Sequence, residues 1–124
     1  MASEGLHEAE GKLSKETKDA HRALVSLQEE LEAIDWYRQR ADAADSADLR
    51  AVLLHNMAEE VEHACMVLEW LRRNVPVFDA NLKTYLFKEA PITEIEAEIT
   101  GEDVPGAAGD EGGPSLTIGK MKGD

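Results

Sequence analysis

Two long stretches without glycine or proline most constrain the fold of this chain. They span residues 13–41 and 47–74, and apolar residues recur in both every three or four positions, which is the spacing of one face of an α-helix. The short acidic segment DAADSAD separates them, and Asp45 or Ser46 there is suited to cap the second helix. Because Pro76 disfavours helical geometry in Val75 before it, the second helix should end at about Asn74. These features predict an antiparallel pair of long helices.

The remainder of the chain predicts shorter helices followed by a linker. Residues 78–86 carry apolar residues at helical spacing, and the isoleucines after Pro91 predict one or two further turns. The segment that follows is rich in glycine, alanine, proline and acidic residues, which is typical of a flexible linker. We therefore expect an all-α protein with a helical domain at 1–99, a linker at 100–114 and a separate terminal peptide at 115–124.

The charge of the chain limits its partners. A formal net charge of −13 argues against binding to nucleic acid phosphates or to an anionic membrane surface, and favours attraction of cations. No apolar run reaches the roughly 20 residues of a membrane span, and the N-terminus has no signal-peptide core, so we expect a cytoplasmic protein. The sole cysteine, Cys65, has no internal disulfide partner, and we expect it to be buried or half-buried.

Two polar residues interrupt an apolar face of the second helix. The stripe with alternating spacings of four and three consists of Leu49, Leu53, Asn56, Glu60, His63, Val67 and Trp70. The neighbouring stripe, which begins at Met57 and ends at Leu71, is wholly apolar. Glu60 and His63 should therefore face another helix rather than water.

The first helix carries one matching carboxylate, Glu30, in the stripe that also contains Leu27 and Ile34. At 1.5 Å per residue, Glu30 lies ~16 Å from the connection between the helices, and Glu60 and His63 lie ~20–24 Å from it. Residues three apart on a helix are neighbours, and carboxylate with imidazole suits iron, manganese or zinc. A buried Glu–His hydrogen bond and a polar pair facing a partner are the alternatives.

One chain supplies half of a di-iron site. Four-helix di-iron proteins use one Glu from each of two helices and Glu-x-x-His from each of the other two. This chain has one such Glu, Glu30, and one Glu-x-x-His, at Glu60 and His63. A two-fold dimer would supply the missing half and cover the apolar faces, which predicts a ferritin-like four-helix bundle completed by dimerisation.

A second acidic pair lies on a different face of the first helix. Glu29 and Glu32 share a stripe with Trp36, and they are either an outer cation site or ordinary surface residues, since like charges at this spacing are mildly unfavourable. For three other histidines we identify no partner at ligand spacing, and we treat them as ordinary residues. They are His7, His21 and His55.

Three motifs resemble the encapsulated ferritins, the small cargo iron oxidases of bacterial encapsulin compartments. They are EELEAIDWYRQRAD, HNMAEEVEHACMVLEWLRRN and LKTYLF…APITEIE, and the resemblance spans about residues 13–98. It implies ferroxidase ligands at Glu30, Glu60 and His63. It also implies an outer site at Glu29 and Glu32, beside Trp36, for calcium or another divalent cation.

The resemblance further implies a ring of dimers, a decamer, with di-iron centres between subunits. Such a ring would oxidise Fe(II) and pass Fe(III) to the encapsulin lumen for mineral storage. Two other functions remain open from the residues alone. One is an assembly protein that metal stabilises without turnover, and the other is a di-iron peroxidase.

The C-terminal SLTIGKMK separately resembles the short targeting peptide that encapsulin cargo proteins carry. Leu116 and Ile118 stand two residues apart, so their side chains would point the same way in an extended chain. Met121 departs from the usual pattern, which more often has Leu at that position. An ordinary disordered terminus is the alternative.

Overall fold

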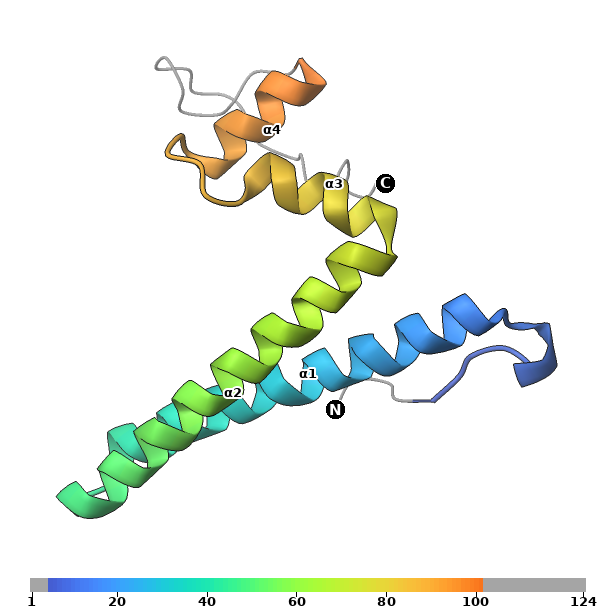
Figure 1. The fold of residues 1–124 in the computed structure, drawn as a ribbon. Helices are drawn as coiled ribbons and strands as arrows, with labels where there is room; N and C mark the ends of the chain where they lie inside the picture. The colour runs from blue at the N-terminus through green and yellow to red at the C-terminus, as the bar shows by residue number, and fades with distance from the viewer. Residues whose placement is uncertain (1–4, 102–124) are drawn as a thin grey trace. The chain divides into compact units, whose positions relative to one another are not determined.

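The computed structural model describes residues 5–101, and every regular element among them is helical. A 3₁₀ turn at Glu10–Lys12 is followed by α1 (Lys15–Ala43), α2 (Ala47–Asn74), α3 (Pro76–Tyr85) and α4 (Ile92–Thr100) (Figure 1). The chain divides into two compact units, the first ending at Val75 and the second beginning at Pro76. No helix within residues 5–101 is long and apolar enough to cross a membrane. The predicted all-α fold is confirmed.

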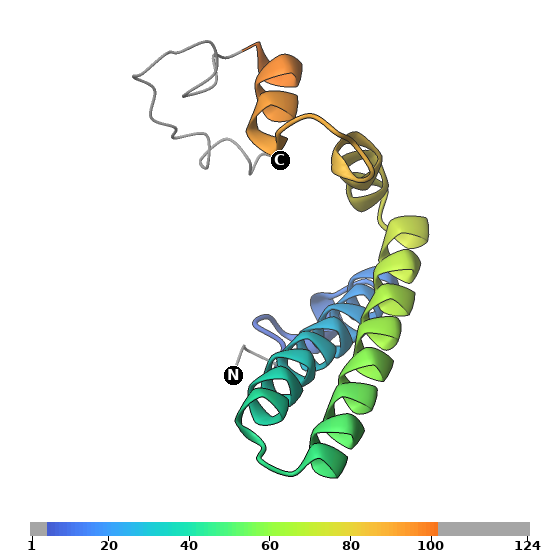
Figure 2. The ribbon, with the colours of Figure 1, turned by 90° about the vertical axis from the view of Figure 1, so that its left-hand side faces the viewer.

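The first unit is the predicted antiparallel hairpin. α1 and α2 lie side by side in both views (Figures 1 and 2), and three residues connect them. Of the two candidate caps, Ser46 is the one that acts, because its hydroxyl accepts a hydrogen bond from the Leu49 N–H at 3.1 Å. Ser14 caps α1 in the same way, accepting from the Thr17 N–H at 3.0 Å. These caps set where both long helices begin.

The second unit contains α3 and α4. Pro76 occupies the first position of α3, where a missing N–H costs no helical hydrogen bond. α4 ends at Thr100 and is capped by Gly101, whose φ of 82° suits glycine and whose N–H donates to the Ala97 carbonyl. With nine residues, α4 is somewhat longer than the one or two turns expected from its isoleucines.

The described part of the chain has almost no core. Only Ala41, Ala64 and Leu71 are buried apolar residues within residues 5–101. Many large apolar side chains of the hairpin are more than a third exposed. Examples are Leu24, Leu31, Leu49, Val52, Val61, Met66 and Trp70. A single hairpin leaves one side of each helix uncovered, and exposed apolar surface of this extent is typical of an interface.

Candidate metal centre

The hairpin brings three predicted ligands together. Glu30 from α1 and Glu60 and His63 from α2 each offer a ligand atom, and these atoms lie within 4.8 Å of one another. Nδ1 of His63 is 3.6 Å from Oε1 of Glu30 and 3.4 Å from Oε1 of Glu60. This is the one group of three such side chains found among residues 5–101. The antiparallel packing of α1 on α2 produces it, because the residues stand at similar heights above the connection.

One carboxylate oxygen of this cluster lacks a hydrogen-bond donor. Oε1 of Glu30 is buried and unpartnered, since the contact of 3.6 Å to His63 is too long for a hydrogen bond. A buried acceptor without a partner is destabilising, and a bound cation would satisfy it. Two carboxylates and one imidazole are also a donor set that iron, manganese and zinc accept. The residues present therefore fit a divalent metal ion.

The charges of the cluster perturb one another. Hydrogen bonding with Glu60 and then burial raise the pKa of Glu30, and the same hydrogen bond lowers the pKa of Glu60. The two carboxyl groups therefore titrate as a coupled pair, in which Glu30 binds a proton more readily than Glu60. Burial lowers the pKa of His63, but the hydrogen bond to Glu60 and the nearby carboxylates outweigh this and raise it. A bound metal cation would favour the deprotonated form of all three side chains.

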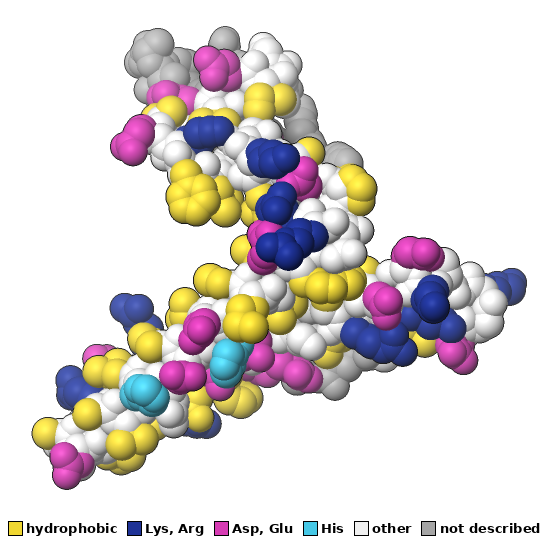
Figure 3. Space-filling view, viewed as in Figure 1, with side chains coloured by type: hydrophobic (Ala, Val, Ile, Leu, Met, Phe, Trp, Pro, Cys, Tyr) yellow, Lys and Arg dark blue, Asp and Glu magenta, His cyan; other side chains and the backbone are white. Residues whose placement is uncertain are grey.

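The cluster is open on one side. The His63 side chain is 46% exposed, whereas those of Glu30 and Glu60 are 23% and 24% exposed. Figure 3 shows histidine and acidic side chains gathered among hydrophobic ones along α2. A half-exposed imidazole beside two half-buried carboxylates leaves room for ligands from a second chain.

The outer pair is arranged differently. Glu29 is exposed, Glu32 is half-buried, and neither joins a group of three ligands within the described part of the chain. The guanidinium of Arg40 lies 5.7 Å from the ring centroid of Trp36, a cation–π contact that the sequence reasoning did not anticipate. Four residues separate Trp36 from Arg40, which is the spacing that would have suggested it. The outer site stays a prediction.

Two expectations about single residues are wrong. Cys65 is exposed rather than buried or half-buried, because α1 covers only one side of α2. His55 does have an acidic partner, since its Nε2 lies 3.6 Å from Oε2 of Glu59. Four residues separate these two, and helical spacing alone could have paired them. The predicted targeting residues Leu116, Ile118 and Met121 lie outside the described residues.

Comparisons with known proteins bear on the family and the fold of this chain. Residues 5–89 match the EncFtn-like family. An encapsulated ferritin-like protein of Rhodospirillum rubrum is 50% identical over 129 aligned positions, covering 100% of this chain and 92% of that protein. The encapsulin nanocompartment cargo protein EncC of Myxococcus xanthus is 36% identical over 78 positions, covering 63% of this chain and 60% of that protein. The crystal structure of a Nitrosomonas europaea protein is 55% identical with a TM-score of 0.68, covering 71% of this chain and 97% of that one.

Proposed function

The chain belongs to the EncFtn-like family, and on that premise we propose that it is a ferroxidase, an enzyme that oxidises Fe(II) to Fe(III). The observation that carries the proposal is the cluster of Glu30, Glu60 and His63 with its unpartnered carboxylate oxygen. Fe(II) is the substrate of this reaction. The donor set suits it, and the ordinary surface of a helix offers no reason for a carboxylate oxygen to be buried without a donor.

The proposed centre is completed by a second copy of the chain. One Glu and one Glu-x-x-His are half of the ligand set of di-iron bundles, and a two-fold axis through the centre would supply the other half. The exposed apolar residues of α1 and α2 support the same arrangement, since a second hairpin would cover them. The family resemblance extends this to a ring of dimers, a decamer.

The residues of the centre would act by charge. Bound Fe(II) would favour the ionised forms of Glu30, whose pKa is raised, and of Glu60. The resulting carboxylates stabilise Fe(III) more than Fe(II), because attraction grows with the charge of the ion, and this lowers the iron potential. Two Fe(II) ions held together supply two electrons, the number that reduces O2 to hydrogen peroxide.

Aerobic addition of Fe(II), followed by the absorbance of Fe(III), tests this proposal. Oxidation should rise above the protein-free background and should increase more than linearly with protein concentration at dilutions where dimers dissociate. Metal that only stabilises an assembly would give the background rate. A di-iron peroxidase would require added hydrogen peroxide and would oxidise no iron faster with O2. Either result would exclude the ferroxidase.

We extend the proposal to the location of the protein, as cargo inside an encapsulin nanocompartment in the cytoplasm. The encapsulated relative and the cargo protein EncC support this, as do the apolar residues of the terminal peptide at 115–124. Leu116, Ile118 and Met121 would fill pockets of the shell protein, and the linker at 100–114 would give them reach. Several peptides on one ring would bind by avidity although each contact is weak.

Two altered proteins test the role of the peptide. Deletion of residues 115–124 should abolish co-purification with a cognate encapsulin and leave the iron oxidation rate unchanged. Fusion of the same ten residues to an unrelated soluble protein should carry that protein into the shell. Packaging of the truncated chain at the level of the full chain would show that the targeting assignment is wrong.

We also propose that Glu29 and Glu32, beside Trp36, form an outer site for calcium or another divalent cation. The acidic pair on one helical face supports this, as does the net charge of −13. In this role the pair would gather cations near the centre without ligating the oxidised ions.

A further inference from the structure

The second unit of the chain contains an apolar groove between α3 and α4. α3 packs against α4, and the chain leaves α3 through Phe87, whose φ of 61° is the left-handed conformation that commonly ends a helix. The groove has a volume of about 530 Å³, and its apolar surface comes from Ala90, Ile95 and Ile99. The Ile99 side chain is 61% exposed. We call this feature the α3–α4 groove.

Four charged residues line the same groove, and the basic ones already have partners. Nζ of Lys83 lies 3.1 Å from Oδ2 of Asp79, and Nζ of Lys88 donates to the Lys83 carbonyl at 2.9 Å. The acidic ones, Glu89 and Glu98, are exposed. Neither makes a hydrogen bond or an ion pair with another residue in the described range 5–101. An apolar groove with two unpaired carboxylates favours an apolar segment that carries positive charge.

The terminal peptide at residues 115–124 has this chemistry. It contains the apolar residues Leu116 and Ile118, and Lys120 and Lys122 follow them. The segment that joins the peptide to α4, residues 102–114, carries acidic residues and no basic one. The positive charge beyond α4 is therefore confined to the peptide, next to its apolar residues.

The spacing of apolar residues in the peptide matches the spacing in the groove. Ile95 and Ile99 are four residues apart on α4, so they stand ~6 Å apart along the helix axis. Leu116 and Ile118 would be ~6.7 Å apart on one side of an extended segment. An extended peptide that lies along α4 can therefore place one apolar side chain against each isoleucine.

The length of the chain after α4 brings the peptide within reach of the groove. Ile99 stands two residues before Gly101, where the described part of the chain ends. α4 has nine residues and is therefore ~14 Å long. A glycine-rich segment as long as residues 102–114 spans ~20 Å on average, so the peptide can reach any part of the groove. Tethering over this distance gives an effective concentration in the millimolar range.

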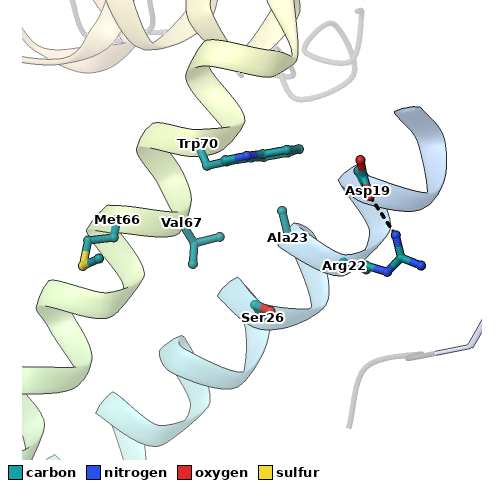
Figure 4. Close-up of a pocket in the computed structure, with 7 residues that line it drawn as sticks. All are labelled: Asp19, Arg22, Ala23, Ser26, Met66, Val67 and Trp70. Atoms are coloured by element: carbon teal, nitrogen blue, oxygen red, sulfur yellow. Dashed lines mark hydrogen bonds and ion pairs between the residues drawn. The ribbon is translucent and has the colours of Figure 1, made fainter. Parts of the chain in front are cut away.

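An open pocket in the first unit suits a different occupant. It lies between α1 and α2 and has a volume of about 480 Å³, with Trp70 of α2 extending toward Ala23 of α1 (Figure 4). Val67 also lines it and follows His63 by four residues, so it belongs to the stripe of the ligands. A second hairpin at the proposed centre would cover this face. We therefore assign the pocket to the proposed dimer contact and not to the peptide.

We propose that the peptide at 115–124 binds the α3–α4 groove of its own chain. Leu116 and Ile118 lie against α4, and the two lysines that follow lie beside Glu89 and Glu98. A docked peptide is not available to a shell protein, so the contact lowers the fraction of chains that can be packaged, and the apparent affinity for the shell falls by that fraction. This consequence rests on the proposed targeting role of the peptide, whereas the docking itself does not.

Disulfide formation within one full-length chain tests the docking. In a Cys65→Ser background, one protein carries Ala90→Cys in the groove together with Leu116→Cys. The matched control carries Thr100→Cys together with Leu116→Cys. Thr100 is nearer to Leu116 in the sequence and does not line the groove, so an undocked peptide would close the control pair faster.

At high dilution the pair with Ala90→Cys should close at least about threefold faster than the control, because docking holds its two cysteines together. Faster closure of the control would overturn the proposal. Chains of two different masses are mixed before oxidation. Disulfides that form mainly between the two masses would assign the groove to the peptide of another copy and would also overturn it.

Competition for packaging tests the consequence of the docking. Ile99→Ala weakens the groove, and Ile92→Ala removes a side chain of α4 that is 71% exposed and does not line it. The two full-length variants are mixed in equal amounts with limiting encapsulin during shell assembly, and the packaged chains are counted by mass spectrometry. Ile99→Ala should be enriched about threefold to tenfold, because release of the peptide raises the competent fraction. Circular dichroism should show equal helix content in both.

Equal packaging of the two variants would overturn the proposed control of packaging. Absence of packaging for every chain, including the unsubstituted one, would instead contradict the targeting role of the peptide. The disulfide result would then decide the docking by itself.

Discussion

Glu29 and Glu30 are adjacent in the sequence and lie in opposite surroundings. Glu30 is half-buried between α1 and α2, and its Oε1 is buried without a donor. Glu29 is exposed, on a face of α1 that α2 does not cover. One step along a helix turns a side chain by roughly 100°, which is enough to move a carboxylate from the helix interface to water. Glu30 is therefore a candidate ligand because its side chain lies on the face of α1 that meets Glu60 and His63 of α2.

The largest expected effect is the difference in iron oxidation rate between variants of Glu30 and of Glu29. Glu30→Gln should reduce aerobic iron oxidation about 100-fold or more, because removing a ligand should cost at least as much as disrupting its outer hydrogen bonds. Glu29→Gln removes the same charge one residue away and serves as the matched control. It should retain most of the activity. Calorimetric titration with Mn²⁺ or Zn²⁺ should show the same order, with strong binding lost only in Glu30→Gln.

Equal losses in the two variants would contradict the assignment of Glu30 as a ligand. They would indicate that overall negative charge, rather than a defined centre, accounts for iron oxidation.

The histidines of α2 give a second pair to compare. His63→Ala removes the imidazole that contacts Glu30 and Glu60 and should slow iron oxidation about 10- to 100-fold, less than loss of a carboxylate because imidazole contributes no negative charge. His55→Ala removes an exposed imidazole that pairs with Glu59. Stopped-flow absorbance should show an almost unchanged iron oxidation rate in His55→Ala. A rate reduced as much as in His63→Ala would contradict the assignment of His63 as a ligand.

A smaller effect should come from the outer pair. Glu29→Ala with Glu32→Ala should slow iron oxidation roughly threefold to tenfold at low iron concentration, as expected when local attraction of cations is removed. The effect should shrink at high salt because of screening. Metal bound at Glu30, Glu60 and His63 should persist in a crystal structure of the double variant. Rates that match the unsubstituted protein at every iron concentration would make the pair ordinary surface residues.

The smallest effect concerns a glutamate held by arginines. Arg72 and then Arg73 lower the pKa of Glu69 from its ordinary 4.5 to about 2, with bonds of 2.8 and 2.7 Å. A lowered pKa in the folded state stabilises the protein above about pH 4.5 and loses this effect as the pH falls toward about 2. Glu69→Gln should therefore lower the melting temperature slightly at pH 7, since the pair is exposed. Calorimetry at a fixed protein concentration should show this difference shrinking below about pH 4.5 and disappearing below about pH 2. A difference that persists there would refute the ion-pair explanation.

The fold was largely predictable from local patterns. Unbroken helical periodicity and the stop at Pro76 predicted the observed bounds of α2, Ala47–Asn74, and the hydroxyl of Ser46 was one of two caps predicted for its start. The Ser14 cap of α1 was not predicted. The stripe arithmetic also predicted that Glu30, Glu60 and His63 meet, because heights along two antiparallel helices follow from residue counts alone. Helix bounds, caps and the heights of residues along a helix depend only on residues that are close together in the sequence.

The features that escaped prediction depend on surroundings. The exposure of Cys65 and the separation of α1 from α2 at Trp70 follow from what packs against each helix, and periodicity does not report this. The positive φ of Phe87 was also not predicted. Glycine is the residue that normally signals such a backbone conformation, and an aromatic residue there gives no such signal. The Arg40 contact with Trp36 was missed although its spacing was in view.

The near absence of a core has a consequence for the life of a newly made chain. With Ala41, Ala64 and Leu71 as the buried apolar residues of the described part, a lone copy displays the kind of apolar surface that chaperones and proteases recognise. Whether such a copy persists then depends on the rate of degradation relative to the rate of association with another copy. Association is faster when expression is high. Abundance should respond cooperatively to the rate of synthesis, so that few copies persist when little protein is made. Quality control by the cell would in this way remove half-sites before they could bind metal.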